Sequence, residues 1–225
     1  MGAAEPGRAA ARPESFTWPL LAVLVVILLQ VLVPARDRLG PPLVVPAVEG
    51  LMLLVLVVIA AQRGPVPRSA RSTVLVLFGV LVAANAAAAG RLVSLVLDNG
   101  DVDGAPPTVG RLLVAAGLVL LANVVMFGLF YWQLDGGGPA GRIAVPTPFP
   151  DFQFPQTAAP ELAAAGWRPH FGDYLYVAFT NVVAFSPTDT LPLTLRSKGL
   201  MALQSVISLG VLVVVLSRVI NILPP

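Results

Sequence analysis

Residues Asp173–Gly199 read DYLYVAFTNVVAFSPTDTLPLTLRSKG, an apolar and aromatic run that breaks into a polar turn with two prolines. The apolar part is about 14 residues long, whereas a helix that crosses a bilayer core needs roughly 20. Non-helical backbone is tolerated at membrane depth only inside protein or along a wet cavity. We therefore expect a short helix that re-enters the membrane or lies at its interface, followed by a turn with a polar environment.

The turn carries hydroxyl and carboxylate side chains at a place where few polar groups are expected. Ser186, Thr188, Asp189 and Thr190 all fall within it. Pro192 ends any helix just before it, and the last span starts after TLRSKG. These four residues are our first candidates for an ion pathway.

The rest of the chain has the composition of a membrane protein. Of its 225 residues, 56% are hydrophobic and 12% are charged, about half the charged fraction of soluble domains. Apolar stretches of spanning length are predicted at Phe16–Val33, Leu43–Ala61, Thr73–Leu97, Leu112–Gln133 and Leu200–Leu223. The predicted fold class is an all-α membrane protein with about five transmembrane helices, plus one short re-entrant or interfacial helix before the last span.

The chain divides into four regions by composition. Residues 1–15 are small, polar and rich in Pro and Gly, which is typical of a disordered tail. Residues 16–133 form a four-helix transmembrane region. Residues 134–172 form a Pro/Gly-rich surface segment, which we expect to lie on the membrane or to pack against the helix ends. Residues 173–225 hold the short helix, the polar turn and the last transmembrane helix.

The basic residues favour a cytoplasmic N-terminus. In that orientation the acidic loop 98–103 lies outside and most arginines lie inside, as the positive-inside rule requires. The inside set comprises Arg8, Arg12, Arg63, Arg68, Arg71, Arg142 and Arg168. Lys198 is the only lysine, and the excess of Arg, Ala, Gly and Pro indicates a GC-rich bacterial genome. We expect a multi-pass protein of the bacterial cytoplasmic (inner) membrane.

Glu49 is the sharpest anomaly inside a predicted span. A carboxylate there costs several kcal/mol unless it is paired, protonated or hydrated. It is either an ion or proton site or a residue near the interface that a neighbouring helix satisfies. Asn85 and Arg91 on the adjacent antiparallel span are candidate partners, because the helical rise places Asn85 at a similar depth. The surrounding sequence AANAAAAG lets a neighbouring helix approach closely.

Asn123 and the polar residues of the last span give weaker signals. Gln204 and Ser208 are four residues apart and share a helical face, with Ser205 beside them. They either form hydrogen bonds between helices or line a polar pathway.

The familiar enzyme motifs are missing from the sequence. There is no Gly-rich phosphate loop, no GxSxG and no HExxH. The absence of cysteine and the single histidine, His170, exclude disulfides and clustered His or Cys metal sites. We expect no enzyme activity, no cofactor and no metal site, and a net charge of +2 is too small to indicate a nucleic-acid partner.

The C-terminal third resembles an uncharacterised bacterial family of multi-pass membrane proteins, classed as a domain of unknown function. The resemblance covers about 70 residues, a length that leaves the first spans unmatched. It rests on an aromatic FP segment, a DYxYxSFT-like helix, an (S/T)D turn followed by Thr and Arg, and a final NI. Here these are Phe154-Pro155, Asp173 to Thr180, Asp189, Thr194, Arg196 and Asn221-Ile222. No activity comes with this resemblance.

The same region is also similar to the pore module of tetrameric cation channels. The resemblance implies that Leu112–Gln133 is the outer helix, Asp173–Phe185 the pore helix and Leu200–Leu223 the pore-lining helix. The filter position, Ala184–Asp189, reads AFSPTD and lacks the glycines of a potassium filter. Side chains of Ser186, Thr188 and Asp189 would then face the ion. A module of this kind with five spans also requires the N-terminus outside, opposite to the arginine distribution.

Three functions remain open from the sequence. The first is an oligomeric pore-loop-type ion channel with SPTDT at its polar site, whose partners are the lipid bilayer, further copies of the chain and an inorganic ion. The second is a small proton-coupled transporter centred on Glu49. The third is a non-transporting membrane scaffold subunit whose polar residues join helices.

Overall fold

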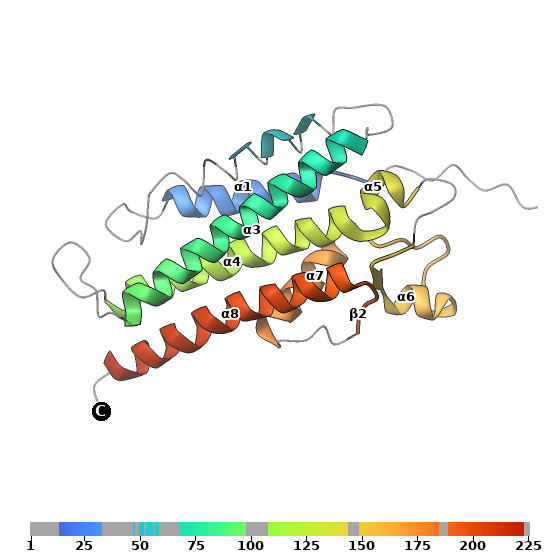
Figure 1. Cartoon of the computed structure of the whole chain (residues 1–225). Helices are drawn as coiled ribbons and strands as arrows, with labels where there is room; N and C mark the ends of the chain where they lie inside the picture. Colours follow the sequence, from blue (N-terminus) through green and yellow to red (C-terminus); the bar gives the residue numbers. More distant parts are fainter. Residues whose placement is uncertain are drawn as a thin grey trace, which may run out of the picture.

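The computed structural model describes residues 14–32, 68–97, 108–143, 149–184 and 189–222, with scattered helical positions between 47 and 58. The described chain is mainly helical, and its long helices lie side by side (Figure 1). The main helices are α1 (Thr17–Leu32), α3 (Arg68–Leu97), α4 (Val109–Leu134), α7 (Phe171–Val183) and α8 (Leu195–Ile222).

Three of the described helical stretches are long and apolar enough to cross a membrane: Ser72–Leu97, Val109–Gly141 and Leu195–Asn221. By length and composition, these helices are compatible with the predicted membrane protein. The predicted count of about five spans is not confirmed. α1 has 16 residues, and the predicted span at residues 43–61 is described only at scattered positions.

α8 begins at Leu195, ahead of the predicted start at Leu200. The backbone N–H of Thr194 donates to Ser197 Oγ, and the backbone N–H of Ser197 donates to Thr194 Oγ1, both at 3.3 Å. This reciprocal pairing is the arrangement of a capping box and satisfies donors that the first turn leaves free. The polar residues before the apolar run therefore belong to the helix.

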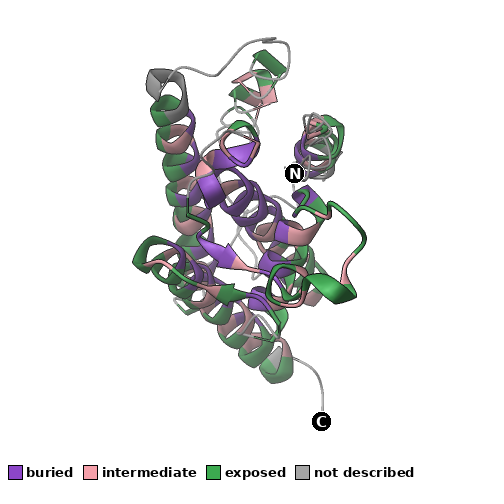
Figure 2. Cartoon of the chain, turned by 90° about the vertical axis from the view of Figure 1, so that its right-hand side faces the viewer, coloured by how far each residue is buried: buried purple, intermediate pink, exposed green. Residues whose placement is uncertain are grey.

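α4 is the central helix of the bundle and packs against α1, α3, α7 and α8. Figure 2 views the molecule from the end where α5 and α6 lie, and the buried residues gather at the centre of the bundle. Phe127, Leu129 and Trp132 of α4 are among the most buried side chains. Gly128 allows a close approach, because a Cβ there would lie 3.1 Å from Leu175 Cα of α7.

α7 is the predicted short helix before the last span. It has 13 residues, so it is about 20 Å long and reaches only part of the way along the bundle. Asp173 accepts a hydrogen bond from the backbone N–H of His170 at 2.7 Å, which fixes the start of the helix. Residues 185–188 lie outside the described residues.

The chain returns after α7 to the end from which that helix started (Figure 1). Strand β2 (Leu191–Pro192) pairs antiparallel with β1 (Phe152–Gln153), which belongs to the segment between α4 and α7. Both strands therefore lie at the end of the bundle where α4 ends and α8 begins. The start of α7 and strand β2, which follows it, therefore lie at the same end of the bundle.

The segment after α4 packs against the helix ends, one of the two placements expected for residues 134–172. It contains η2 (Asp135–Gly137), α5 (Gly138–Gly141), α6 (Pro155–Ala158) and η3 (Pro160–Leu162). The chain turns sharply at Gly136, Gly137 and Gly138, which have positive φ angles. Phe152 and Phe154 are buried, so this part of the predicted surface segment belongs to the core.

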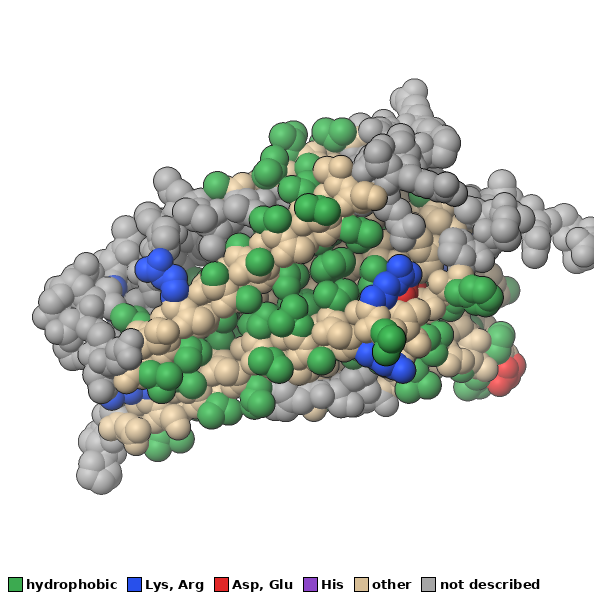
Figure 3. Space-filling view, viewed as in Figure 1, with side chains coloured by type: hydrophobic (Ala, Val, Ile, Leu, Met, Phe, Trp, Pro, Cys, Tyr) green, Lys and Arg blue, Asp and Glu red, His purple; other side chains and the backbone are tan. Residues whose placement is uncertain are grey.

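The outer faces of the long helices are apolar. Figure 3 shows hydrophobic side chains along the helices, with charged side chains toward the two ends. The exposed positions include Val76 and Val80 of α3 and Val206, Val213 and Ile220 of α8. Exposed apolar surface of this extent is unusual for a soluble monomer and suits contact with lipid.

Candidate functional site

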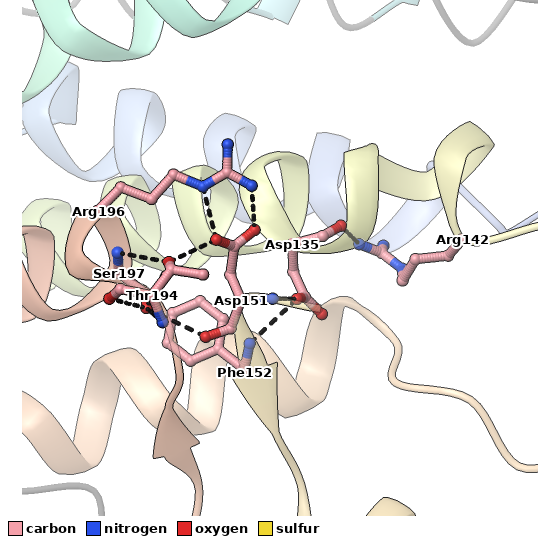
Figure 4. A network of polar contacts seen from close by, with 7 residues as sticks. All are labelled: Asp135, Arg142, Asp151, Phe152, Thr194, Arg196 and Ser197. Carbon is pink, nitrogen blue, oxygen red and sulfur yellow. Dashed lines mark hydrogen bonds and ion pairs between the residues drawn. The ribbon is translucent and has the colours of Figure 1, made fainter. Parts of the chain in front are cut away.

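Asp151 is the centre of a polar network at the end of the bundle (Figure 4). Its side chain is fully buried. Oδ1 accepts hydrogen bonds from Thr194 Oγ1 and Arg196 Nε, both at 2.6 Å, and Oδ2 accepts one from Arg196 Nη2 at 2.7 Å. Its backbone oxygen accepts from Ser197 Oγ at 3.1 Å. Asp151 thus ties the loop after α4 to the first turn of α8.

Asp135 joins the end of α4 to α7 and β1 through a second set of hydrogen bonds. Oδ1 accepts hydrogen bonds from the backbone N–H groups of Asp151 at 2.5 Å and Phe152 at 3.1 Å. Oδ2 accepts from the hydroxyl of Tyr174 at 2.5 Å. Burial raises the pKa of Tyr174 well above its ordinary value, so the phenol keeps the proton that it donates. The end of α4 is thereby joined to the first turn of α7.

Arg142 lies buried beside these carboxylates and holds the start of α1. Nε and Nη2 donate to the two oxygens of Glu14, each at 2.8 Å. Nη1 donates to the backbone oxygens of Trp132 and Asp135. Burial disfavours the charged guanidinium, but the bond to Glu14 and the neighbouring negative charges leave its pKa raised. Arg142 also lies over the ring of Tyr174, 5.1 Å from its centroid.

Glu14 differs from its prediction as part of a disordered tail. Its side chain is only 8% exposed, and it also accepts a 2.7 Å hydrogen bond from Trp132 Nε1. A bidentate arginine–carboxylate pair inside protein is strong only when such extra bonds accompany it. The folded part of the chain therefore begins no later than Glu14.

A second buried network joins α4, α7 and α8 within the bundle. Gln204 Oε1 accepts from the hydroxyl of Tyr131 at 2.7 Å and from Asn181 Nδ2 at 2.9 Å. Gln204 Nε2 donates to the backbone oxygen of Ala178 at 3.0 Å. Ser205 Oγ donates to Asn181 Oδ1 at 3.1 Å. Gln204 and Ser205 thus make hydrogen bonds between helices, one of the two roles considered for them.

Of the other predicted pathway residues, the structure describes Ser208, Asp189 and Thr190. Ser208 is buried and donates to the backbone oxygen of Gln204 in its own helix, at 2.8 Å. Asp189 is exposed just before β2, and its Oδ1 accepts from the buried Thr190 at 3.3 Å. Ser186 and Thr188 lie outside the described residues. Their role as ion-pathway residues stays a prediction.

The predicted intramembrane polar residues have different surroundings. Arg91 is exposed on α3, whereas Asn85 and Asn123 are 2% and 0% exposed. Asn85 Nδ2 and both polar side-chain atoms of Asn123 have no hydrogen-bond partner among the described residues. Glu49 lies outside the described residues, so its pairing with Asn85 or Arg91 stays a prediction.

The polar groups at the bundle end were not selected as candidates from the sequence. Only the fold brings Asp135, Arg142, Asp151 and Tyr174 together, so in the sequence they look like ordinary charges and aromatics beside a span. In the part of the chain that the structure describes, no three His, Cys, Asp or Glu side chains form a group that could hold a metal ion.

No family model, curated protein or solved structure matches this chain. The resemblances to the uncharacterised membrane family and to the channel pore module therefore rest on the quoted motifs alone.

Proposed function

We propose that this chain is a pore-loop-type subunit of the bacterial cytoplasmic membrane, in which several copies surround an ion path. The repeating unit is α4, α7 and α8. The observation that carries the proposal is the half-length helix α7, which enters and leaves the bundle at one end between two helices of spanning length.

This arrangement supports a proposal for the position of the polar turn after α7. α7 ends at Val183, part of the way along the bundle, and the chain is back at its starting end by Leu191. Polar backbone at membrane depth needs protein or water around it. The hydroxyls of Ser186 and Thr188 and the carboxylate of Asp189 are the groups proposed to meet the ion there.

The buried networks supply the rigidity that a re-entrant helix needs. Tyr174 in the first turn of α7 is bonded to Asp135 of the α4 end. Asn181 in its last turns is bonded to Gln204 of α8. A helix fixed at both ends is the kind of rigid support that a selective ion site beside it requires.

The orientation differs from that of tetrameric cation channels. Glu14 and Arg142 are bonded to each other, so the start of α1 lies at the same end of the bundle as the base of α7. The arginine distribution favours the cytoplasm for that end. The proposed pore loop then enters from the cytoplasmic side, and the C-terminus lies on the opposite side.

A non-transporting scaffold subunit is the second candidate. It is favoured by α8, whose polar residues Gln204 and Ser208 are fully buried inside the protomer. The outer face of α8 presents apolar residues such as Val206, Val213 and Ile220. A helix that lines a conducting path usually offers some polar surface to it. The transporter hypothesis centred on Glu49 has no supporting contact among the described residues.

The test combines oligomeric state with ion flux. The full chain would be purified, sized by native mass spectrometry and reconstituted into liposomes for flux of Na⁺, K⁺, H⁺ and Cl⁻. We expect a closed oligomer and cation flux that falls in Asp189→Asn but not in Glu161→Gln. Glu161 is a matched control because it is an exposed acid in η3 at the same end of the molecule. A monomer that carries no ion would favour the scaffold.

A further inference from the structure

Asn85 of α3 and Asn123 of α4 are buried polar side chains with amide atoms that lack a hydrogen-bond partner among the described residues. They are 2% and 0% exposed. Asn85 Nδ2, Asn123 Nδ2 and Asn123 Oδ1 have no partner among the described residues. Most buried polar groups in proteins are bonded, and each exception needs an explanation, such as strain or a bound water or ion. The contrast with the satisfied amides of Asn181 and Gln204 in the same bundle is clear.

The two asparagines lie at the same level of the α3–α4 interface. Phe78 of α3 stacks on Phe130 of α4, with ring centroids 5.6 Å apart and an interplanar angle of 18°. The two helices run antiparallel (Figure 1). Asn85 follows Phe78 by seven residues, and Asn123 precedes Phe130 by seven residues.

Seven residues are close to two helical turns, so each asparagine faces within roughly 20° of its phenylalanine. Since the phenylalanines meet, the asparagines face each other across the same interface. They lie roughly 10 Å along the bundle from the stacked rings.

The segments of α3 and α4 around the two asparagines favour an uncharged ligand. Neither α3 between residues 74 and 90 nor α4 between residues 112 and 134 carries a charged residue. Divalent cations need about six or more oxygen ligands, usually with carboxylates. Each carboxamide offers two donors and two acceptors, which suits a ligand that both donates and accepts hydrogen bonds.

The residues around Asn85 on α3 are small, and so is one neighbour of Asn123 on α4. The α3 sequence around Asn85 is AANAAAAG, and Ala122 precedes Asn123 on α4. Buried water typically makes about three hydrogen bonds to groups that are otherwise unsatisfied. We infer that Asn85 and Asn123 together hold water between α3 and α4, as an internal hydration site within the membrane-spanning part of the protein.

The decisive experiment is radiolytic hydroxyl labelling of the full-length protein in lipid nanodiscs. Water bound inside a protein produces radicals that oxidise adjacent side chains even when these are buried. Met126 is 3% exposed and one turn from Asn123, and Met201 of α8 is a 5% exposed control beside the fully bonded Gln204 network. We expect Met126 to be oxidised several-fold faster than Met201. Equal or slower oxidation of Met126 would overturn the proposal, without any variant.

Variants add a second readout. Asn85→Leu and Asn123→Leu should each lower the Met126 oxidation rate to that of Met201, while Val125→Leu, at a buried apolar neighbour, should not. The loss of Tm in the double variant should be smaller than the sum of the single losses, because the two residues share one ligand. Additive Tm losses would contradict a shared water. Tm losses that are not additive, without faster oxidation of Met126, would also contradict it and would indicate a direct bond between the two amides.

Discussion

The carboxylate of Asp151 accepts hydrogen bonds from two nitrogens on one edge of the Arg196 guanidinium, with Oδ1–Nε and Oδ2–Nη2 distances of 2.6 and 2.7 Å. The partners differ in their surroundings, because the side chain of Asp151 is 0% exposed and that of Arg196 is 54% exposed. A half-exposed cation thus neutralises a fully buried acid. The pair joins the loop before β1 to the base of α8, and its loss should loosen both.

Replacing Arg196 should destabilise the protein more than its exposure suggests. Arg196→Ala leaves a buried carboxylate with Thr194 as its remaining side-chain donor. We expect the free energy of unfolding to fall by about 1–3 kcal/mol, the usual cost of an unsatisfied buried group. Because solvent surrounds the guanidinium, this loss should be smaller than for a fully buried pair. Thermal unfolding in detergent measures it. Lys198→Ala is the exposed control; equal effects of the two changes would mean that the ion pair adds no stability.

Tyr174 should make stability depend on alkaline pH. Its folded pKa is raised by burial, whereas an unfolded tyrosine titrates near pH 10. The neutral phenol is therefore favoured in the fold, so this contribution is present below about pH 10 and is lost as pH rises further. Tyr174→Phe should flatten the decline of Tm between about pH 9 and 11. Tyr176→Phe, at an exposed position of the same helix, should leave the decline unchanged.

The hydropathy pattern was sufficient to predict the mainly helical fold and the short helix before the last long apolar helix. α7 could be predicted because its apolar run is too short to span and ends in a proline-containing turn. The start of α8 was missed because the capping pair Thr194 and Ser197 looks like loop sequence. Spacing alone could not decide whether Gln204 forms hydrogen bonds between helices or lines a polar pathway, because its partners Tyr131 and Asn181 lie on other helices.

The network at the bundle end could not be predicted. Glu14 and Arg142 are separated by 128 residues, and neither stands out beside a span, where charges are common. Asp135 and Asp151 likewise become special only when the glycine turn after α4 brings their segment back against the helix ends. A polar residue inside an apolar run gives a signal in the sequence, whereas one just outside it does not.

Breaking the Glu14–Arg142 pair should release the start of α1. Glu14→Ala leaves a buried guanidinium without its anion, and we expect a loss of about 3 kcal/mol, typical of removing one partner of a buried pair. Hydrogen exchange would show faster exchange of the first turns of α1, because Glu14 also binds Trp132. Glu161→Ala is the exposed control. Unchanged exchange of α1 would show that the pair does not anchor it.

Two glycines of α4 should respond oppositely to the same substitution. A Cβ at Gly128 would lie 3.1 Å from Leu175 Cα and 3.2 Å from Leu175 Cδ1, whereas a Cβ at Gly117 would meet nothing within 4 Å. Gly128→Ala should therefore push α7 away from α4 and destabilise the protein by about 1–3 kcal/mol, the usual cost of overpacking. Gly117→Ala should be neutral or stabilising by up to about 1 kcal/mol, because alanine favours the helix. Unfolding in detergent measures both changes. If α7 positions the polar turn, Gly128→Ala should also reduce any ion flux that Gly117→Ala retains. Equal stability of the two variants would contradict close packing of α7 on α4.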